Sequence, residues 1–563
     1  MSKCRTRALI AGAAAALVGT GMVAIAAATS AYGSTTSPSW APTHTKSLAS
    51  LLTGATKLGP LGSTVPLRVD VGLPARSPAA LAALAEGEST PGRTDFGHYL
   101  TPAQYLARFG PTQASVNAVT GYLRDEGFTH LGVDANHLLI SATGTAADVE
   151  KAFNTSLDVF NAGGHHIYAN ASPAEVPSSL AGDVAVVLGL SDIPMNSVSP
   201  MVGTPKTPLT GYYPKEFQTV YDATGTPTGA KTSIAVMAEG DLTGVISDLR
   251  YAEAKQGLPQ VPVTVVPAGP ASSDTSGADE WDLDTQVSTG MAQTVRRLYI
   301  YDASTLTDFD FAHAINLFVT QDKARLGSAS IGEPDALAYL DGSMIEIDQS
   351  VEEGVVQGQS FFASTGDTGA SCAIEDTNGV SDSGLTAQLC YPADGTWTTA
   401  VGGTTLVTDS SDNYVAEAAW NAGGGGVSDL EYPGPWTDNA NPAAAAGARG
   451  DPDIAMDADL TTGADIYVNK VAETIGGTSV SSPLSMGAVA RVQSALGNKL
   501  GAAVLRFYAL YNAANPAAGD VNATPGFHDI VAGSNGLYVA TPGWDYTTGI
   551  GSIEVAALIK ALS

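Results

Sequence analysis

The sequence contains few cysteines and few basic side chains, and each shortage narrows what the protein can be. Only three of the 563 residues are cysteine. Cys4 lies ahead of an apolar run near the N-terminus, so Cys372 and Cys390 are the one pair in the rest of the chain. Lysine and arginine total 26 against 56 acidic residues, which gives a formal net charge of −30. The phosphates of nucleic acid would repel such a chain, so nucleic-acid binding is not expected.

Long apolar runs are absent after residue 28, which leaves no second candidate for a membrane span. Residues 8–28 form a run rich in Ala, Gly and Val behind three basic residues. This pattern is typical of a secretory signal peptide, with small residues for cleavage after Ala28 or Ala31. An N-terminal membrane anchor is the alternative, because the run is near spanning length. We expect residues 1–31 to be removed and the protein to be secreted, with no stable membrane association after processing.

Histidine is scarce in the C-terminal two thirds of the chain. Of the eight histidines, only His313 and His528 follow residue 166. A serine nucleophile usually needs a histidine as its general base. His313 lies in a helix-like segment and His528 lies beside an acidic turn, so a structural role is the simpler interpretation of each. A Ser-His-Asp triad is poorly supplied, and carboxylates become the other candidates for a base.

The candidate nucleophile is Ser479, which follows two glycines at the start of an apolar run. Residues 479–496 carry apolar side chains at roughly helical spacing, and Pro483 fits a first helical turn. Ser479 would therefore stand at a helix N-terminus, where it is accessible and the helix dipole is favourable. The alternative is a Ser-rich loop that only caps a structural helix.

Residues 279–284 place four acids within six positions. Glu280 and Asp284 would share one helical face, where like charges are locally unfavourable. A solvated acidic face is the alternative interpretation. Asp367 lies where a strand runs into a turn flanked by glycines, and by itself it indicates only a turn.

The order of predicted elements divides the chain after the signal segment. Residues 32–64, rich in Ser, Thr, Pro and Gly, are expected to form a linker. The strand and helix patterns of residues 65–195 predict a compact α+β unit, and the composition of residues 196–210 predicts a second linker. In residues 211–563, buried strands alternate with helices, which predicts an α/β domain with a mostly parallel sheet. The expected strands are 234–238, 263–266, 298–301, 328–331, 361–364 and 398–401, and the expected helices include 243–256, 308–322 and 345–358.

From about residue 65 to the C-terminus, the sequence resembles the sedolisin family of serine-carboxyl peptidases, including the kumamolisin-type acid endopeptidases. The resemblance rests on Gly477-Thr478-Ser479 with Pro483, on the Glu-x-x-x-Asp spacing of Glu280 and Asp284, on the turn around Asp367, and on Tyr99-Leu100-Thr101-Pro102. Where many relatives read Ser-x-Ser-aromatic-Gly, this chain has Ser328-Ala329-Ser330-Ile331-Gly332. That departure leaves the subsite preference open.

The resemblance implies a subtilisin-like peptidase domain at residues 211–563 and a ferredoxin-like activation domain at residues 65–195. The latter would be a propeptide that acts as an intramolecular inhibitor. By resemblance, Ser479 is the nucleophile, Glu280 its base, Asp284 the partner that orients Glu280, and Asp367 the donor to the oxyanion. We expect a monomeric, secreted, acid-acting serine-carboxyl endopeptidase that is made as a zymogen and cuts proteins or peptides. The alternatives are a tripeptidyl exopeptidase of the same family and a catalytically inactive secreted binding protein.

The resemblance also implies a calcium site near the C-terminus. The expected ligands of Ca²⁺ are the side chains of Asp529 and Asp545 and the carbonyls of Ile530, Thr541 and Gly543. Two ordinary turn aspartates are the alternative. Thr541 stands where relatives often have glycine, and its carbonyl remains available.

Two further expectations concern cross-links and pH. The two remaining cysteines predict a Cys372–Cys390 disulfide, and the 17 residues between them put its entropic stabilisation at about 3 kcal/mol. We also expect acid to loosen the propeptide, by protonating carboxylates that pair with basic residues across its interface.

Overall fold

The computed structural model describes residues 39–52, 54–162, 164–197, 201–202, 211–372, 388–437, 447–517 and 519–563. Residues 40–563 form one compact unit. The predicted signal segment and most of the loop between the two cysteines lie outside the described residues. Within the described ranges, no helix combines the length and the apolarity needed to cross a membrane.

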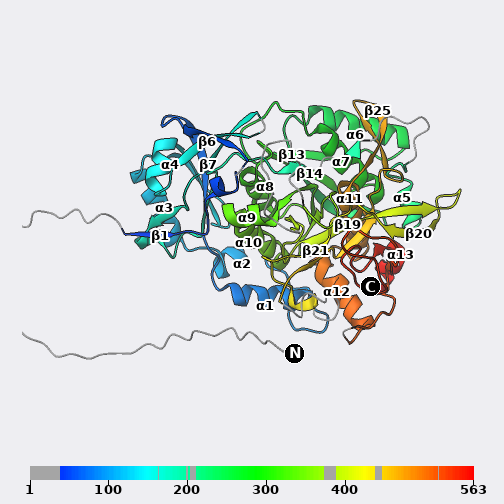
Figure 1. Ribbon diagram of the computed structural model, residues 1–563. Helices are drawn as coiled ribbons and strands as arrows, with labels where there is room; N and C mark the ends of the chain where they lie inside the picture. The colour runs from blue at the N-terminus through cyan, green and yellow to red at the C-terminus, as the bar shows by residue number, and fades with distance from the viewer. Residues whose placement is uncertain are drawn as a thin grey trace, which may run out of the picture. The chain divides into compact units, whose positions relative to one another are not determined.

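An eight-stranded sheet forms the centre of the larger domain (Figure 1). The strand order is β13 (Val263–Pro267), β14 (Arg297–Ala303), β12 (Ser233–Glu239), β15 (Leu326–Ala329), β17 (Ser360–Ser364), β19 (Thr399–Thr408) and β20 (Tyr414–Ala419), and β23 (Ile454–Asp457) also pairs with β19. All neighbours are parallel except β19 and β20. The central strands are apolar and fully buried, as a parallel sheet covered by helices requires. The prediction of an α/β domain with a mostly parallel sheet is confirmed.

Two pairs of helices pack with this sheet. One pair is α7 (Ala278–Ala292) with α11 (Thr478–Ala495), and the other is α8 (Asp308–Gln321) with α10 (Ser343–Val356). Both α7 and α11 contact β12, and α11 also contacts β17 and β19. The helix α6 (Thr243–Gln256) packs on α7. The helices expected from sequence periodicity are therefore present, with ends within two residues.

The strand expected at residues 328–331 is divided at Ser330. β15 ends at Ala329, and β16 (Ile331–Pro334) leaves the sheet to pair antiparallel with β18 (Cys390–Tyr391) and β10 (Asn196–Ser197). The apolar pattern of the segment gave no sign of this break, because both halves are buried. The division separates a sheet strand from a strand that pairs with the segment after the N-terminal domain.

The N-terminal domain contains a four-stranded antiparallel sheet. Its strand order is β4 (Thr129–Val133), β5 (Leu139–Thr145), β3 (Pro66–Gly72) and β9 (Val186–Leu188). The helix α3 (Gln113–Asp125) precedes β4, and α4 (Ala146–Ala152) follows β5 with a capping box at Thr145. This β-α-β-β-α-β order is the ferredoxin-like motif, as expected.

The range 32–64, which was expected to be a linker, is folded in part. β1 (Trp40–Pro42) pairs with β8 (Glu175–Pro177), and β2 (Thr56–Pro60) pairs with β6 (Leu157–Ala162), the partner of β7 (His165–Asn170). Proline is tolerated at strand ends and sheet edges, so a Pro-rich composition misleads here. The remaining helices and strands are α1 (Pro78–Ser89), α2 (Pro102–Arg108), β11 (Met201–Val202), α5 (Phe217–Val220), α9 (Asp335–Asp341), β21 (Gly426–Val427), β22 (Gly450–Asp451), β24 (Ala464–Val468), β25 (Val471–Gly476), α12 (Ala503–Ala514), β26 (Phe527–His528), β27 (Ser552–Ile553) and α13 (Val555–Leu562).

Candidate active site

Two of the predicted acids lie one turn apart on α7 and are fully buried. Glu280 is in the first turn of the helix, and Asp284 follows four residues later. Both residues have an exposed fraction of 0%. The alternative interpretation, a solvated acidic face, is therefore wrong for Glu280 and Asp284.

Ser479 is the second residue of α11, which packs directly on α7. The two helices approach closely at Gly487, where a Cβ atom would lie 2.5 Å from the carbonyl oxygen of Ser288. A larger residue at this position would push the helices apart. Ser479 is itself buried, and its side chain lies near enough to the Glu280 carboxyl to lower its pKa. Neither carboxylate oxygen of Glu280 has a hydrogen-bond partner among the described residues. The structure thus brings the predicted nucleophile to the predicted base.

The ionisation of Glu280 is set by its surroundings. Burial is the main cause that raises its pKa well above the ordinary value, and the negative charge of Asp284 is the next. The nearby Ser479 hydroxyl acts in the opposite direction and lowers the pKa. Because the two carboxyls interact strongly, their protons belong to the pair rather than to either residue.

Asp284 is held from the other side by Ser330. The Ser330 hydroxyl donates to Oδ1 of Asp284 at 2.6 Å. Burial raises the pKa of Asp284, and this hydrogen bond lowers it. Oδ2 of Asp284 has no hydrogen-bond partner among the described residues, so it is the atom left to carry a proton.

Asp367 lies in the turn after β17, beside the start of α11. Its Oδ1 accepts hydrogen bonds from the backbone N–H of Thr478 at 2.7 Å and from the Thr478 hydroxyl at 2.8 Å. Its Oδ2 lies next to Gly477, where φ is +123° and a Cβ atom would stand 2.5 Å from that oxygen. Burial raises the pKa of Asp367 to about 6, although the hydrogen bonds from Thr478 lower it. Oδ2 has no partner within the described part of the chain.

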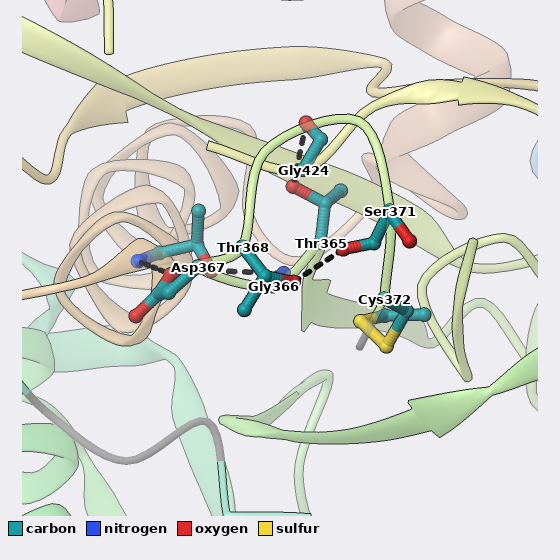
Figure 2. Close-up of a disulfide and its surroundings, with 9 residues drawn as sticks. Thr365, Gly366, Asp367, Thr368, Ser371, Cys372 and Gly424 are labelled. Carbon is teal, nitrogen blue, oxygen red and sulfur yellow. Dashed lines mark hydrogen bonds between the residues drawn. A yellow bond between two sulfur atoms is a disulfide. The ribbon is translucent and has the colours of Figure 1, made fainter. Parts of the chain in front are cut away.

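A disulfide braces this turn. Cys372 is bonded to Cys390, as predicted from the cysteine count. Figure 2 shows Cys372 on the loop that also carries Gly366 and Asp367. A Cβ atom on Gly366 would lie 2.5 Å from Sγ of Cys390, so the turn packs against the disulfide itself. Since β18 pairs with β16, the bond ties the Asp367 turn to that strand.

The two histidines of the larger domain have other neighbours. His313, on α8, lies 3.3 Å from Asp70 and 4.0 Å from Asp134 of the N-terminal domain. His528 stacks on the ring of Tyr414 at 3.9 Å. Neither is part of the cluster around Ser479, which is consistent with the structural roles expected for them.

Sequence reasoning missed two residues that hold the cluster. Thr478 was noted only as part of the Gly-Thr-Ser motif, yet it bonds Asp367 through both its N–H and its hydroxyl. Ser330 was noted only as part of a predicted strand. Its place in a Ser-x-Ser pattern was the one available signal, because nothing in a sequence shows which hydroxyl faces a buried carboxyl.

The chain between the two domains runs along both sides of this cluster. β10 pairs with β16, with Asn196 opposite Gly332. β11 then pairs with β25, with Met201 opposite Gly476. β25 ends directly before the segment that carries Ser479. The range 196–210, expected as a linker, thus contains two short paired strands on either side of the site.

The predicted calcium ligands lie in two neighbouring turns. Both carboxylate oxygens of Asp529 face the backbone N–H of Gly543, and Asp545 accepts hydrogen bonds from Thr541 and Thr547. Burial raises the pKa of both aspartates, and the charge of Asp545 raises that of Asp529 further. In the described ranges, no group of three or more His, Cys, Asp or Glu side chains could hold a metal ion. Two repelling carboxylates among backbone groups nevertheless fit an oxygen-liganded cation such as calcium.

Comparison with known proteins identifies both domains. Residues 53–193 match the family described as "Pro-kumamolisin, activation domain", and residues 267–549 match the "Subtilase family". Sedolisin from Pseudomonas sp. (strain 101) is 35% identical, over 95% of this chain and 94% of that protein. Xanthomonalisin from Xanthomonas sp. (strain T-22) is 32% identical, over 95% of this chain and 74% of that protein.

A solved structure of a relative agrees with these matches. It is Pseudomonas sedolisin, a serine-carboxyl proteinase, complexed with two molecules of pseudo-iodotyrostatin. It is 34% identical and superposes with a TM-score of 0.57, over 64% of this chain and 98% of that chain. The activation domain, the subtilisin-like sheet and these relatives together show that the chain belongs to the sedolisin family of serine-carboxyl peptidases.

Proposed function

We propose that this serine peptidase is a secreted, acid-acting endopeptidase in which carboxyl groups replace the usual histidine. Ser479 attacks the peptide carbonyl, and Glu280 accepts its proton and later returns one to the leaving amine. Asp284 orients Glu280, and protonated Asp367 donates to the oxyanion. The buried contact between Ser479 and Glu280 carries this proposal, because both histidines of the domain have other neighbours.

The reaction needs one ionised carboxyl in the Glu280–Asp284 pair and a protonated Asp367. Two interacting carboxyls release their protons in separate steps, so Glu280 and Asp284 share one proton and one negative charge over an intermediate pH range. That charge makes Glu280 a base. Asp367 must keep its proton, and its pKa of about 6 sets the upper limit of that range.

An endopeptidase mode is supported by the course of the chain through the site. β10 and β11 pair with β16 and β25, the strands that adjoin Ser330 and Ser479 along the chain, so extended chain can bind at two strands next to the site. A tripeptidyl exopeptidase needs a barrier on the amino-terminal side. An inactive binding protein would have no need for a hydroxyl in contact with a buried carboxyl. Secretion is supported by the N-terminal basic and apolar segment and by the disulfide.

The zymogen should process itself between Ser197 and Met201. β10 ends at Ser197 and β11 begins at Met201, and their partner strands β16 and β25 adjoin Ser330 and Ser479 along the chain, so the bonds between β10 and β11 are the candidates for cleavage. Incubation of the precursor at about pH 4 should yield a mature chain whose N-terminus, read by mass spectrometry, falls in this interval. The Ser479→Ala precursor should stay intact unless active enzyme is added. Self-cleavage of that variant would exclude Ser479, and an N-terminus beyond residue 202 would exclude the placement.

The activation domain docks on α8 and α10 through acids as well as bases. Glu346 on α10 is fully buried, and a Cβ on Gly72 of β3 would lie 2.9 Å from its Oε2. The polar contacts across the interface include the Arg68–Asp310 ion pair (3.0 Å), His313 with Asp70 (3.3 Å) and the hydrogen bond from Asn136 to Glu353 (2.7 Å).

The pKa directions at this interface oppose the loosening by acid that the sequence analysis predicted. Burial raises the pKa of Asp134, raises that of Glu346 well above its ordinary value, and raises that of Glu353 to about 8. Burial would lower the pKa of His313, but Asp70 outweighs it and the net direction is upward. Every one of these groups binds its proton more tightly in the folded precursor than as a free side chain, so folding of the precursor takes up protons. The contribution of Glu353 to stability is complete below its ordinary pKa of 4.5 and is lost as the pH rises toward about 8.

We therefore expect acid alone not to unfold the precursor at this interface. The uncleaved Ser479→Ala precursor should have a higher melting temperature at about pH 5 than at about pH 8.5, measured by differential scanning fluorimetry. The Glu353→Gln variant should show a weaker dependence on pH. A melting temperature that is higher at about pH 8.5 than at about pH 5 would reverse the sign of this linkage.

We also propose that Asp529 and Asp545, with the carbonyls of Ile530, Thr541 and Gly543, bind calcium. The ion would cross-link two turns and relieve the repulsion between the two carboxylates. Bound calcium at a hundred times its Kd would add about 2.7 kcal/mol of stability. EDTA should lower the melting temperature of the wild type and leave the Asp529→Asn variant unaffected. A dialysed protein without calcium whose melting temperature ignores EDTA would contradict the assignment.

A further inference from the structure

We propose that Ser330 is a positioning residue for the Glu280–Asp284 pair: its hydroxyl holds one oxygen of Asp284, so that the pair stays ionised and aligned at acidic pH. This inference rests on the proposed function, because it needs Glu280 to act as the base. It begins with the hydrogen bond of 2.6 Å from the Ser330 hydroxyl to Oδ1 of Asp284, between residues with an exposed fraction of 0%.

The Ser330 hydroxyl matters for the pair because no cation in the described part of the chain stabilises the pair's negative charge. The charged groups that face the pair are acids: Asp279 on α7 and Asp367 after β17 both raise the pKa of Glu280. Among the described residues, no basic side chain forms an ion pair with either carboxyl. The negative charge of the pair is therefore stabilised by neutral groups: Ser479 lowers the pKa of Glu280, and the hydrogen bond from Ser330 lowers that of Asp284.

These two donors differ in what happens to them during the reaction. Ser479 loses its proton when it attacks, so its interaction with Glu280 changes during the reaction. Ser330 takes no part in bond making, so its donation to Asp284 continues through every step. Because it holds Oδ1, the proton of Asp284 is confined to Oδ2, the oxygen without a partner among the described residues.

The position of Ser330 also links the pair to the path of the peptide. It is the single residue between β15 and β16, and β16 pairs with the backbone at residues 196–197. A peptide on β16 is therefore bound next to the residue that holds Asp284. This explains why the segment needs a short polar residue at the break, where the sequence pattern predicted a continuous strand.

The Ser330→Ala variant should shift the acidic limb of the kcat/KM profile upward by about one pH unit. Removing a donor to an ionised group favours the protonated form, and one such hydrogen bond is worth roughly that shift. The alkaline limb, which depends on Asp367, should stay in place. KM should change little at the optimum, since the backbone of β16 is retained. A merely structural role would lower activity at every pH alike.

Ser328→Ala is the matched control. Ser328 is as buried as Ser330, but its hydroxyl is hydrogen-bonded to the Ser482 hydroxyl at 3.0 Å. The acidic limb of the Ser328→Ala profile should therefore match that of the wild type. In the Ser330→Cys variant, the thiol fills similar space but is a weaker hydrogen-bond donor, so the acidic limb should also move upward. This variant serves as the test if the alanine variant does not fold. If the wild type is acid-active and neither Ser330 variant moves the limb, the inference is wrong while the proposed function stands. If Glu280→Gln remains active, the proposed function itself fails.

Discussion

Replacing Glu280 by glutamine should lower kcat of the mature enzyme by about 10⁴-fold, the upper range for the loss of a general base. Glutamine has nearly the same shape, but its amide cannot accept the proton of Ser479. The two side chains interact in the buried site, and the substitution removes the group that could take the proton there. Steady-state hydrolysis of a fluorogenic peptide at about pH 4, with the matured variant, measures the effect.

Asp279→Asn is the matched control for this loss. Asp279 precedes Glu280 in the first turn of α7, and its replacement by asparagine is the same carboxyl-to-amide change in a partly exposed position. Its charge raises the pKa of Glu280, but Asp279 is not the group proposed to take the proton. It should keep wild-type activity within a few fold, whereas Ser479→Ala should be at least as damaged as Glu280→Gln. A Glu280→Gln variant that retains more than about a tenth of the wild-type kcat would show that another group takes the proton.

The Asp367→Asn variant should lose about 10²-fold in kcat at the acidic optimum and much less above pH 6. In the wild type, Asp367 donates to the oxyanion only while it is protonated, and its pKa is about 6. Activity is therefore present below this value and falls as the pH rises through it. The asparagine amide is a neutral donor at every pH, so the alkaline limb should flatten. The ratio of variant to wild-type kcat across the pH range measures this directly.

The Thr478→Val variant is a control that changes the pKa of Asp367 without removing its carboxyl. The hydrogen bonds from Thr478 lower the pKa of Asp367, so the loss of the hydroxyl should raise that pKa and move the alkaline limb upward. An Asp367→Asn variant whose alkaline limb coincides with that of the wild type would mean that another group titrates there.

The parts of the site that the sequence predicts are those encoded by local patterns. Glu280 and Asp284 are four residues apart, and helical geometry alone places them on one face. The glycines before Ser479 predict a helix start, and the structure begins α11 at Thr478. Alternating apolar segments predict the parallel sheet, because each strand is buried on both faces.

The parts that the sequence does not predict depend on contacts between distant segments. The hydrogen bond from Ser330 to Asp284 spans 46 residues, and those from Thr478 to Asp367 span 111. The strands within residues 40–60 were missed because their pairing partners lie 98 to 137 residues away. The acid-rich docking face was missed for the same reason, since Glu353 and Asn136 meet only in the folded chain.

The pH dependence of kcat/KM for the mature wild-type enzyme tests most directly whether carboxyl groups do the work of a histidine. A fluorogenic peptide assayed from about pH 2 to about pH 9 should give a bell-shaped profile with its maximum at about pH 3 to 5. Its acidic limb reports the Glu280–Asp284 pair, and its alkaline limb reports Asp367 near pH 6. Activity at about pH 7 should be small. An optimum at about pH 8 would contradict this account and return His313 and His528 to consideration as the base.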